Sequence, residues 1–124
     1  MVATCDLAIA EKSTKFGVNG VNIGLFCSTP MVALSRNLSN KHAMQMLLTG
    51  DLIDAQDAYR MGLVNEVVDA EDLETKTMEL AQKIASKSPL TVAIGKEAYY
   101  RQAELPLGEA YDYTKDVMVR NLEA

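Results

Sequence analysis

Basic residues never cluster along this 124-residue sequence, and its net charge is −5. Nucleic acid and anionic membrane surfaces are therefore not expected as partners, because both recognise concentrated positive charge. No apolar run reaches the roughly 18 residues that a membrane span needs. The first residues also lack the basic and apolar regions of a secretory signal peptide. The sequence predicts a globular protein without nucleic-acid or membrane partners.

Cysteine and histidine are also scarce. Cys5 and Cys27 lie in apolar segments without CxxC spacing, and His42 is the only histidine. Disulfide-stapled secreted domains carry a framework of regularly spaced cysteines. Both thiols are therefore expected to be reduced in a cytoplasmic protein, or in the mitochondrial matrix if the source is eukaryotic. His42 has no second histidine and no cysteine nearby, which predicts a surface or capping residue and no metal site.

Glycine is concentrated in one stretch, Phe16–Pro30 (FGVNGVNIGLFCSTP), which holds three of the seven glycines. Glycine permits positive φ or a close backbone approach, and asparagine tolerates the same conformation. The pair Thr29–Pro30 is typical of an N-cap followed by proline in the first helical position. The stretch predicts a strand, a loop and a helix whose amides point back at the loop. Such a loop can hold an anion or a polarised carbonyl, or it is a tight connection with no ligand.

Strands and helices alternate in the first half, and the second half is almost all helix. Strands are predicted at 5–10, 15–17 and 63–68, and helices at about 30–38, 40–49, 54–62, 69–88, 89–102 and from 106 onward. Four of these helices have predicted starts, after Ser39–Asn40, at the capping-box pattern that opens with Asp54, at the cap Asp69 and at Ser88–Pro89. Gly50 and Gly62 are predicted to end the second and third helices. This predicts an α/β core over 1–68 and a helical region over 69–124, with further strands expected upstream. Helical spacing predicts three buried faces: Ala43, Met44, Leu47 and Leu48; Leu73, Thr77, Leu80, Ala81, Ile84 and Ala85; and Leu107, Ala110, Tyr111, Thr114, Met118 and Leu122.

Three segments resemble the carboxyl-terminal half of the crotonase (enoyl-CoA hydratase/isomerase) superfamily. They are CDLAIAEKSTKFGVNGVNIGL, LLTGDLIDAQDAYRMGLVNEVV and AQKIASKSPLTVAIGKEAYYR, and the pattern over Thr49–Val64 is the most specific. The resemblance implies ββα units wound into a spiral, followed by a helical trimerisation region. It also implies a lyase or isomerase of fatty acid metabolism that assembles as a trimer or hexamer. Its ligand would be a coenzyme A thioester, with no other cofactor, whose carbonyl two backbone amides polarise in an oxyanion hole.

The family's second catalytic glutamate has no counterpart in this sequence. Hydratases of the family use two glutamates, one to activate water and one to deliver the proton. The family pattern FG-x-PE-x-x-x-G starts here at Phe16, which places Asn19 at the proline and Gly20 at the glutamate. Some isomerases use an aspartate, and Ser28 stands at its position. If Gly20 merely lacks the side chain, an empty space is expected beside its Cα, facing the acyl pocket. If the backbone requires glycine instead, a positive φ is expected, with the Cα turned away from any pocket.

The remaining candidates for an acyl pocket come from the same loop. They are Asn19, Gly20, Asn22, Leu25, Phe26 and Cys27. A nucleophilic role for Cys27 or Ser28 would need an activating base, and the sequence shows none nearby. Three hypotheses follow: an acyl-CoA enzyme that is inactive as this chain alone, a non-catalytic crotonase-fold subunit that binds acyl-CoA or a protein, and a truncated structural chain.

Overall fold

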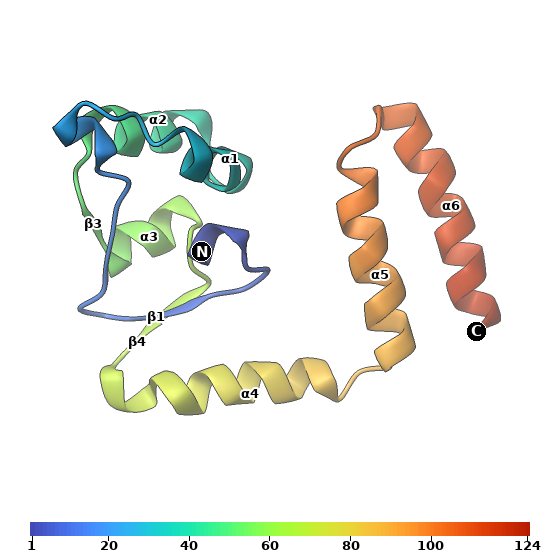
Figure 1. The fold of residues 1–124 in the computed structure, drawn as a ribbon. Coiled ribbons are helices and arrows are strands. Elements are labelled where there is room, and N and C mark those ends of the chain that lie inside the picture. The colour runs from blue at the N-terminus through green and yellow to red at the C-terminus, as the bar shows by residue number, and fades with distance from the viewer. The chain divides into compact units, whose positions relative to one another are not determined.

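The computed structural model describes residues 1–124, which form two compact units, 1–78 and 79–124 (Figure 1). The first unit contains the short 3₁₀ helices η1, η2 and η3, the four strands, helices α1 to α3 and the start of α4. The second contains the end of α4 and the helices α5 and α6. The bounds are η1 Val2–Thr4, β1 Ile9–Glu11, β2 Lys15–Phe16, η2 Gly20–Ile23, α1 Ser28–Asn37, α2 Asn40–Thr49, β3 Ile53–Asp54, α3 Ala55–Met61, β4 Glu66–Val68, η3 Ala70–Asp72, α4 Leu73–Ala85, α5 Pro89–Gln102 and α6 Leu107–Glu123.

Two small sheets organise the first unit. β1 pairs in parallel with β4, and β2 pairs antiparallel with β3. The strand predicted at 5–10 is displaced toward its carboxyl end, because residues 2–4 form η1 and pairing with β4 covers only residues 9–11. Asn65 bonds to Ala8 just before the paired residues of β1 and β4. Its backbone N–H donates to the Ala8 carbonyl at 2.7 Å, and its side-chain Oδ1 accepts from the Ala8 N–H at 2.8 Å. The length of β1 is therefore set by the residues of β4 that pair with it.

Asp69 occupies the predicted N-cap position, before the 3₁₀ turn η3 that leads into α4. Its side chain makes no capping hydrogen bond. The Asp69 carboxylate pairs with the Lys12 ammonium at 2.8 Å. That hydrogen bond and the opposite charge raise the pKa of Lys12. The ion pair lies at the far end of β1 and β4, so Asp69 contributes to joining the two strands.

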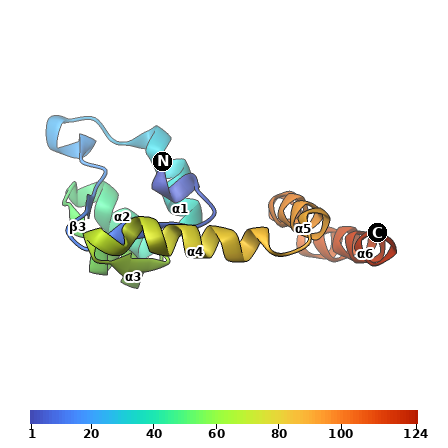
Figure 2. The same ribbon diagram turned by 90° about the horizontal axis from the view of Figure 1, so that it is seen from below.

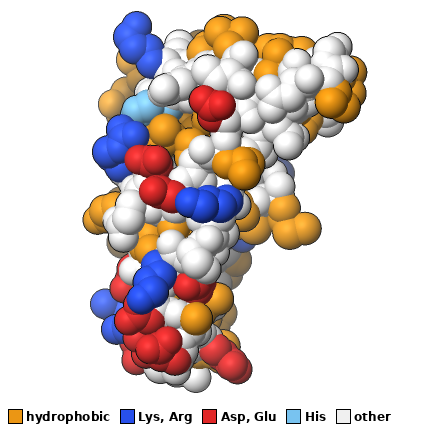
Figure 3. Space-filling model, turned by 90° about the vertical axis from the view of Figure 1, so that its left-hand side faces the viewer, with side chains coloured by type: hydrophobic (Ala, Val, Ile, Leu, Met, Phe, Trp, Pro, Cys, Tyr) orange, Lys and Arg blue, Asp and Glu red, His pale blue; other side chains and the backbone are white.

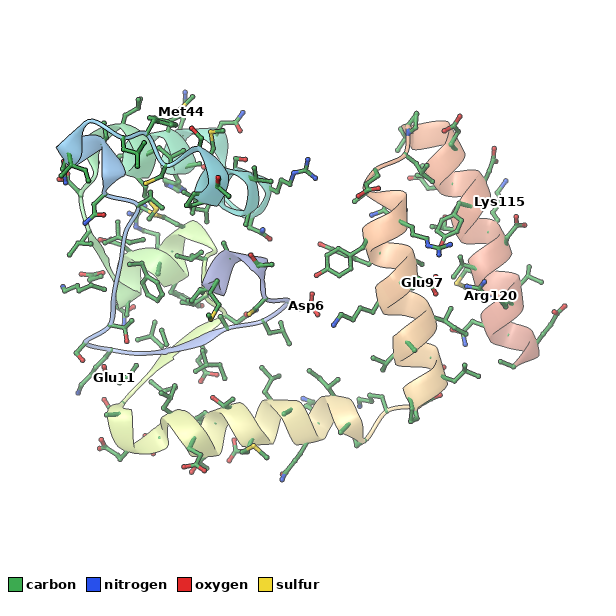
Figure 4. All side chains as sticks on the ribbon, in the orientation of Figure 1. Asp6, Glu11, Met44, Glu97, Lys115 and Arg120 are labelled. Carbon is green, nitrogen blue, oxygen red and sulfur yellow. The ribbon has the colours of Figure 1, made fainter.

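Helix α2 has its predicted ends and a different buried face. The Ser39 side chain accepts from the His42 N–H, as an N-cap does, and Gly50 ends the helix at φ 67°. Met46 is buried beside Ala43 and Leu47, whereas Met44 is 54% exposed and projects outward (Figure 4). Leu48 is 62% exposed. The helix carries two adjacent apolar stripes, and packing against the core selects the stripe that includes Met46.

Helix α3 forms as predicted. The Asp54 carboxylate accepts from the Asp57 N–H at 2.8 Å, which satisfies one free donor of the first turn. Gly62 ends the helix at φ 88°. Ala55 and Ala58 are completely buried. They join a core made mainly by β1, α1, α2 and α3, whose buried members are Ala10, Leu34, Leu38, Ala43, Met46, Leu47, Ile53, Ala55, Ala58, Leu63 and Val64.

In the second unit, α5 and α6 lie side by side (Figures 1 and 2). The Ser88 side chain caps α5 by accepting from the Thr91 N–H, with Pro89 in the first turn, as predicted. The contact between the helices uses small residues: Ala98 and Ala110 are buried, with Val117. Asn121 Nδ2 donates to Thr91 Oγ1 at 3.2 Å. Small side chains at this contact let the two helices approach closely.

Most residues of two predicted buried faces remain at the surface, Ala110 of α6 being buried. On α6, Leu107, Tyr111, Met118 and Leu122 are between 62% and 80% exposed. No residue of α4 is buried. The apolar stripe of α6 lies next to the stripe that contacts α5, and one neighbouring helix covers only one of them. Periodicity located both amphipathic helices, but it overstated what this chain alone can bury.

Candidate functional site

The glycine-rich loop is closed by its own backbone. Gly24, at φ 80°, donates its N–H to the Val21 carbonyl at 3.2 Å, and the Leu25 N–H donates to the Gly20 carbonyl at 2.9 Å. This pair of bonds is the Schellman arrangement that ends helices, here ending η2. Only glycine adopts that φ without strain. The loop is therefore a compact turn joining β2 to α1.

Helix α1 begins earlier than predicted. It starts at Ser28, with Cys27 as the N-cap residue and no side-chain capping bond. The Met31 N–H donates to the Cys27 carbonyl at 3.0 Å, which places Thr29 and Pro30 within the first turn. Proline is tolerated there because the first-turn amides have no partner inside the helix. The prediction of Thr29 as the N-cap is wrong.

The empty space expected beside Gly20 is absent, so that prediction is wrong. The Gly20 φ is not positive. A Cβ added there would collide with the Leu25 carbonyl oxygen and would lie 2.8 Å from Cys27 Sγ. The Gly20 N–H donates to that sulfur at 3.3 Å. Glycine is required here because the loop folds back onto its Cα.

The other candidate residues of the loop have separate positions. Asn22 Nδ2 donates to the Gly50 carbonyl at 3.3 Å and so ties the loop to the end of α2. Phe26 and Cys27 are half-buried against the core, whereas Leu25 is 66% exposed. Asn19 is also exposed. Ser28 Oγ donates to the Phe26 carbonyl at 3.4 Å. Of the six pocket candidates, only Gly20, Leu25 and Cys27 contact one another, and the others and Ser28 have separate partners or lie at the surface.

A cavity of about 400 Å³ lies beside this loop. It is bounded by the first residues of the chain, the end of β2 and one side of α1, and none of the six pocket candidates lines it. No lining residue has an ionisable side chain, and Thr4 and Thr29 supply the only side-chain hydroxyls. The lining residues are Met1, Val2, Ala3, Thr4, Phe16, Gly17, Val18, Thr29, Pro30, Ala33, Leu34, Met46 and Leu63.

The sequence did not predict this cavity, because the opening residues have the pattern of an approach to a strand. Thr29 and Ala33 are one helical turn apart. This spacing could have indicated that one side of α1 faces the opening residues of the chain. Chemically, the cavity can hold an apolar group. Its own side chains cannot transfer a proton.

Metal and membrane sites are not found. No group of three or more histidine, cysteine, aspartate or glutamate side chains is placed to hold a metal ion. None of the helices combines the length and apolar character required to cross a membrane. The surface in Figure 3 mixes charged and hydrophobic side chains over the same face. Of the sites considered, the cavity and the adjoining loop therefore remain the candidate functional site.

The sequence profile described as Enoyl-CoA hydratase/isomerase matches residues 1–123. The chain belongs to this family. It is 48% identical to the mitochondrial enoyl-CoA hydratase domain-containing protein 3 of Mus musculus, over 98% of this chain and 41% of that protein. It is 38% identical to the (E)-benzylidenesuccinyl-CoA hydratase of Thauera aromatica, over 89% of this chain and 43% of that enzyme.

Solved structures confirm the predicted α/β crotonase-type fold. The enoyl-CoA hydratase of Mycobacterium smegmatis superposes with a TM-score of 0.94 at 45% identity, covering 98% of this chain and 47% of that chain. Human enoyl Coenzyme A hydratase domain-containing protein 3 superposes with a TM-score of 0.93 at 47% identity, covering 99% of this chain and 49% of that chain. The chain thus spans about half the length of these relatives.

Proposed function

We propose that this chain forms part of the acyl pocket of an enoyl-CoA hydratase/isomerase-type protein and supplies no proton-transferring carboxylate. The observation that carries the proposal is the apolar cavity, which has no ionisable side chain among its lining residues. Such walls suit the acyl portion of a coenzyme A thioester. In the proposed pocket, backbone amides outside this chain polarise the thioester carbonyl as an oxyanion hole, because a developing enolate needs fixed donors.

The packing of Gly20 favours a non-catalytic role for this half of the pocket. Gly20 brings no carboxylate, and the contacts of its Cα with Leu25 and Cys27 leave no space for another side chain. Ser28 does not replace it, because its hydroxyl bonds to the Phe26 carbonyl and has no base beside it. The second function we consider is therefore an acyl-CoA-binding subunit of the crotonase fold. The mitochondrial designation of the mouse relative supports the mitochondrial matrix as the compartment in a eukaryotic source.

The 124-residue chain alone is expected to show no measurable hydration of a short enoyl-CoA. General acid–base catalysis needs positioned acids and bases, and the cavity offers none. Hydration is measured as loss of the absorbance of the conjugated thioester. Binding of the saturated acyl-CoA is measured separately by calorimetry. Turnover at roughly 1–10³ s⁻¹, typical of enzymes, would show that the chain contains an acid and a base that we have not assigned. Absence of acyl-CoA binding to a chain completed by the amino-terminal part of a relative would contradict the binding role.

A homo-oligomer, a trimer or hexamer, is expected through the second unit. The exposed stripe Leu107, Tyr111, Met118 and Leu122 is supporting evidence, since apolar surface of this kind is usually covered. Sedimentation velocity should give the trimer or hexamer at micromolar concentration, and Met118→Lys should shift it toward monomer. Val119→Lys, outside the stripe on the same helix, is the matched control. A monomeric parent chain would contradict the assembly.

A further inference from the structure

A second pocket lies where α2, β3 and α3 meet. Its volume is about 200 Å³. Its charged side chains are Asp51, Asp57 and Arg60, and its apolar side chains include Leu52 and Met61. Unlike the apolar cavity described above, this pocket therefore has a mixed lining, in which part of the wall can still contact an apolar chain.

Met46 is the one residue that lines both this second pocket and the apolar cavity. It is 3% exposed and belongs to the core of the first unit. The two spaces also come close at Gly17, which lines the cavity, because a Cβ added there would collide with Leu52 Cδ2 in the wall of the pocket. The cavity and the pocket are therefore separated by a single residue at Met46 and by the contact of Leu52 with Gly17.

A wall of this kind determines how long a chain a cavity can hold. Each methylene buried in an apolar site raises the affinity about fourfold, and this gain stops where the cavity ends. Methionine has a flexible, unbranched side chain that fills irregular gaps, so it is well suited to close such an end. We propose that Met46 determines the longest acyl group that the cavity accepts, by separating the cavity from the second pocket. The proposal rests on the acyl-pocket function proposed above and gives Met46 no part in the chemistry.

The test is a series of saturated acyl-CoAs, from butanoyl-CoA to hexadecanoyl-CoA, whose binding is measured by calorimetry. The protein is this chain completed by the amino-terminal part of the mouse relative, the portion that this chain does not match. With Met46 in place, the affinity is expected to rise about fourfold per methylene and then to level off. Met46→Val, whose shorter side chain opens the wall, should move this limit by about two methylenes or more. The longest acyl-CoA should then bind roughly tenfold tighter, or more, than it binds to the parent.

Two control variants separate the opening of the wall from a general change in the core. Met46→Leu has nearly the same volume and should keep the limit of the parent. Leu63→Val shortens a buried side chain that lines the cavity and does not line the second pocket. It should shift the limit by about one methylene at most, because it enlarges the cavity without opening it.

The outcomes distinguish this proposal from the function on which it rests. A limit that moves no further in Met46→Val than in Leu63→Val would overturn the role of Met46. An affinity that rises through the whole series in the parent would overturn it as well, even if Met46→Val fails to fold. Binding of no acyl-CoA at all would instead contradict the acyl-pocket function itself.

Discussion

Replacing Gly20 by glutamate is expected to lower the free energy of unfolding by about 1–3 kcal/mol and to create no hydratase activity. The family resemblance places a glutamate at this position, and in the structure the loop itself fills the space beside the Gly20 Cα. A Cβ at residue 20 meets the Leu25 carbonyl and Cys27 Sγ, so the loop must open before any side chain fits. Opening it also breaks the Gly20 N–H bond to the sulfur. The carboxylate would then have no fixed position, which general acid catalysis requires.

Urea unfolding followed by circular dichroism measures the stability loss, and Gly20→Ala separates the effect of Cβ from that of charge. Gly95→Ala is the matched control, because its Cβ meets nothing within 4 Å in the middle of α5. That control should be neutral or stabilise by up to about 1 kcal/mol. Hydration is assayed with the amino-terminal part of the mouse relative present. A stable Gly20→Glu chain with measurable hydration would show that the loop does not hold the closed geometry.

Leu47→Ala is expected to cost about 2–5 kcal/mol of unfolding free energy, the largest effect of any substitution proposed. Leu47 is 2% exposed and belongs to the core of the first unit. Truncating it removes buried apolar surface and leaves a cavity between α2 and its neighbours. Leu48→Ala, on the next residue of the same helix, is expected to change stability by no more than about 0.5 kcal/mol, because Leu48 is 62% exposed.

The pair Leu47 and Leu48 has the same side chain in the same helix, so helix propensity cancels in the comparison. Thermal or urea denaturation of the two variants beside the parent chain gives the difference directly. Equal losses would mean that α2 buries the wider face predicted by its periodicity. A larger loss at Leu48 would place the core on the other stripe of the helix and contradict the packing described above.

The local chemistry of the sequence was sufficient to predict the caps and ends of several helices. Ser39 and Asp54 satisfy the first free amide donors of their helices, and Gly50 and Gly62 supply the positive φ that ends those helices. The three segments that resemble the family, of which Thr49–Val64 is the most specific, were sufficient to predict the family, and the profile match confirms it. These features depend on neighbours within a few residues, and sequence reasoning is strongest at that range.

The loop and the buried faces depended on contacts between distant segments. Asp69 is a good N-cap by type, yet it pairs with Lys12, far away in the sequence, because β1 and β4 lie side by side. The sequence suggested that Gly20 had lost a side chain, whereas the structure shows Leu25 and Cys27 filling that position. Met44 and Leu48 fit the helical period as well as Met46 does. Periodicity gives the direction of each side chain around a helix axis, and only tertiary packing decides which direction is covered.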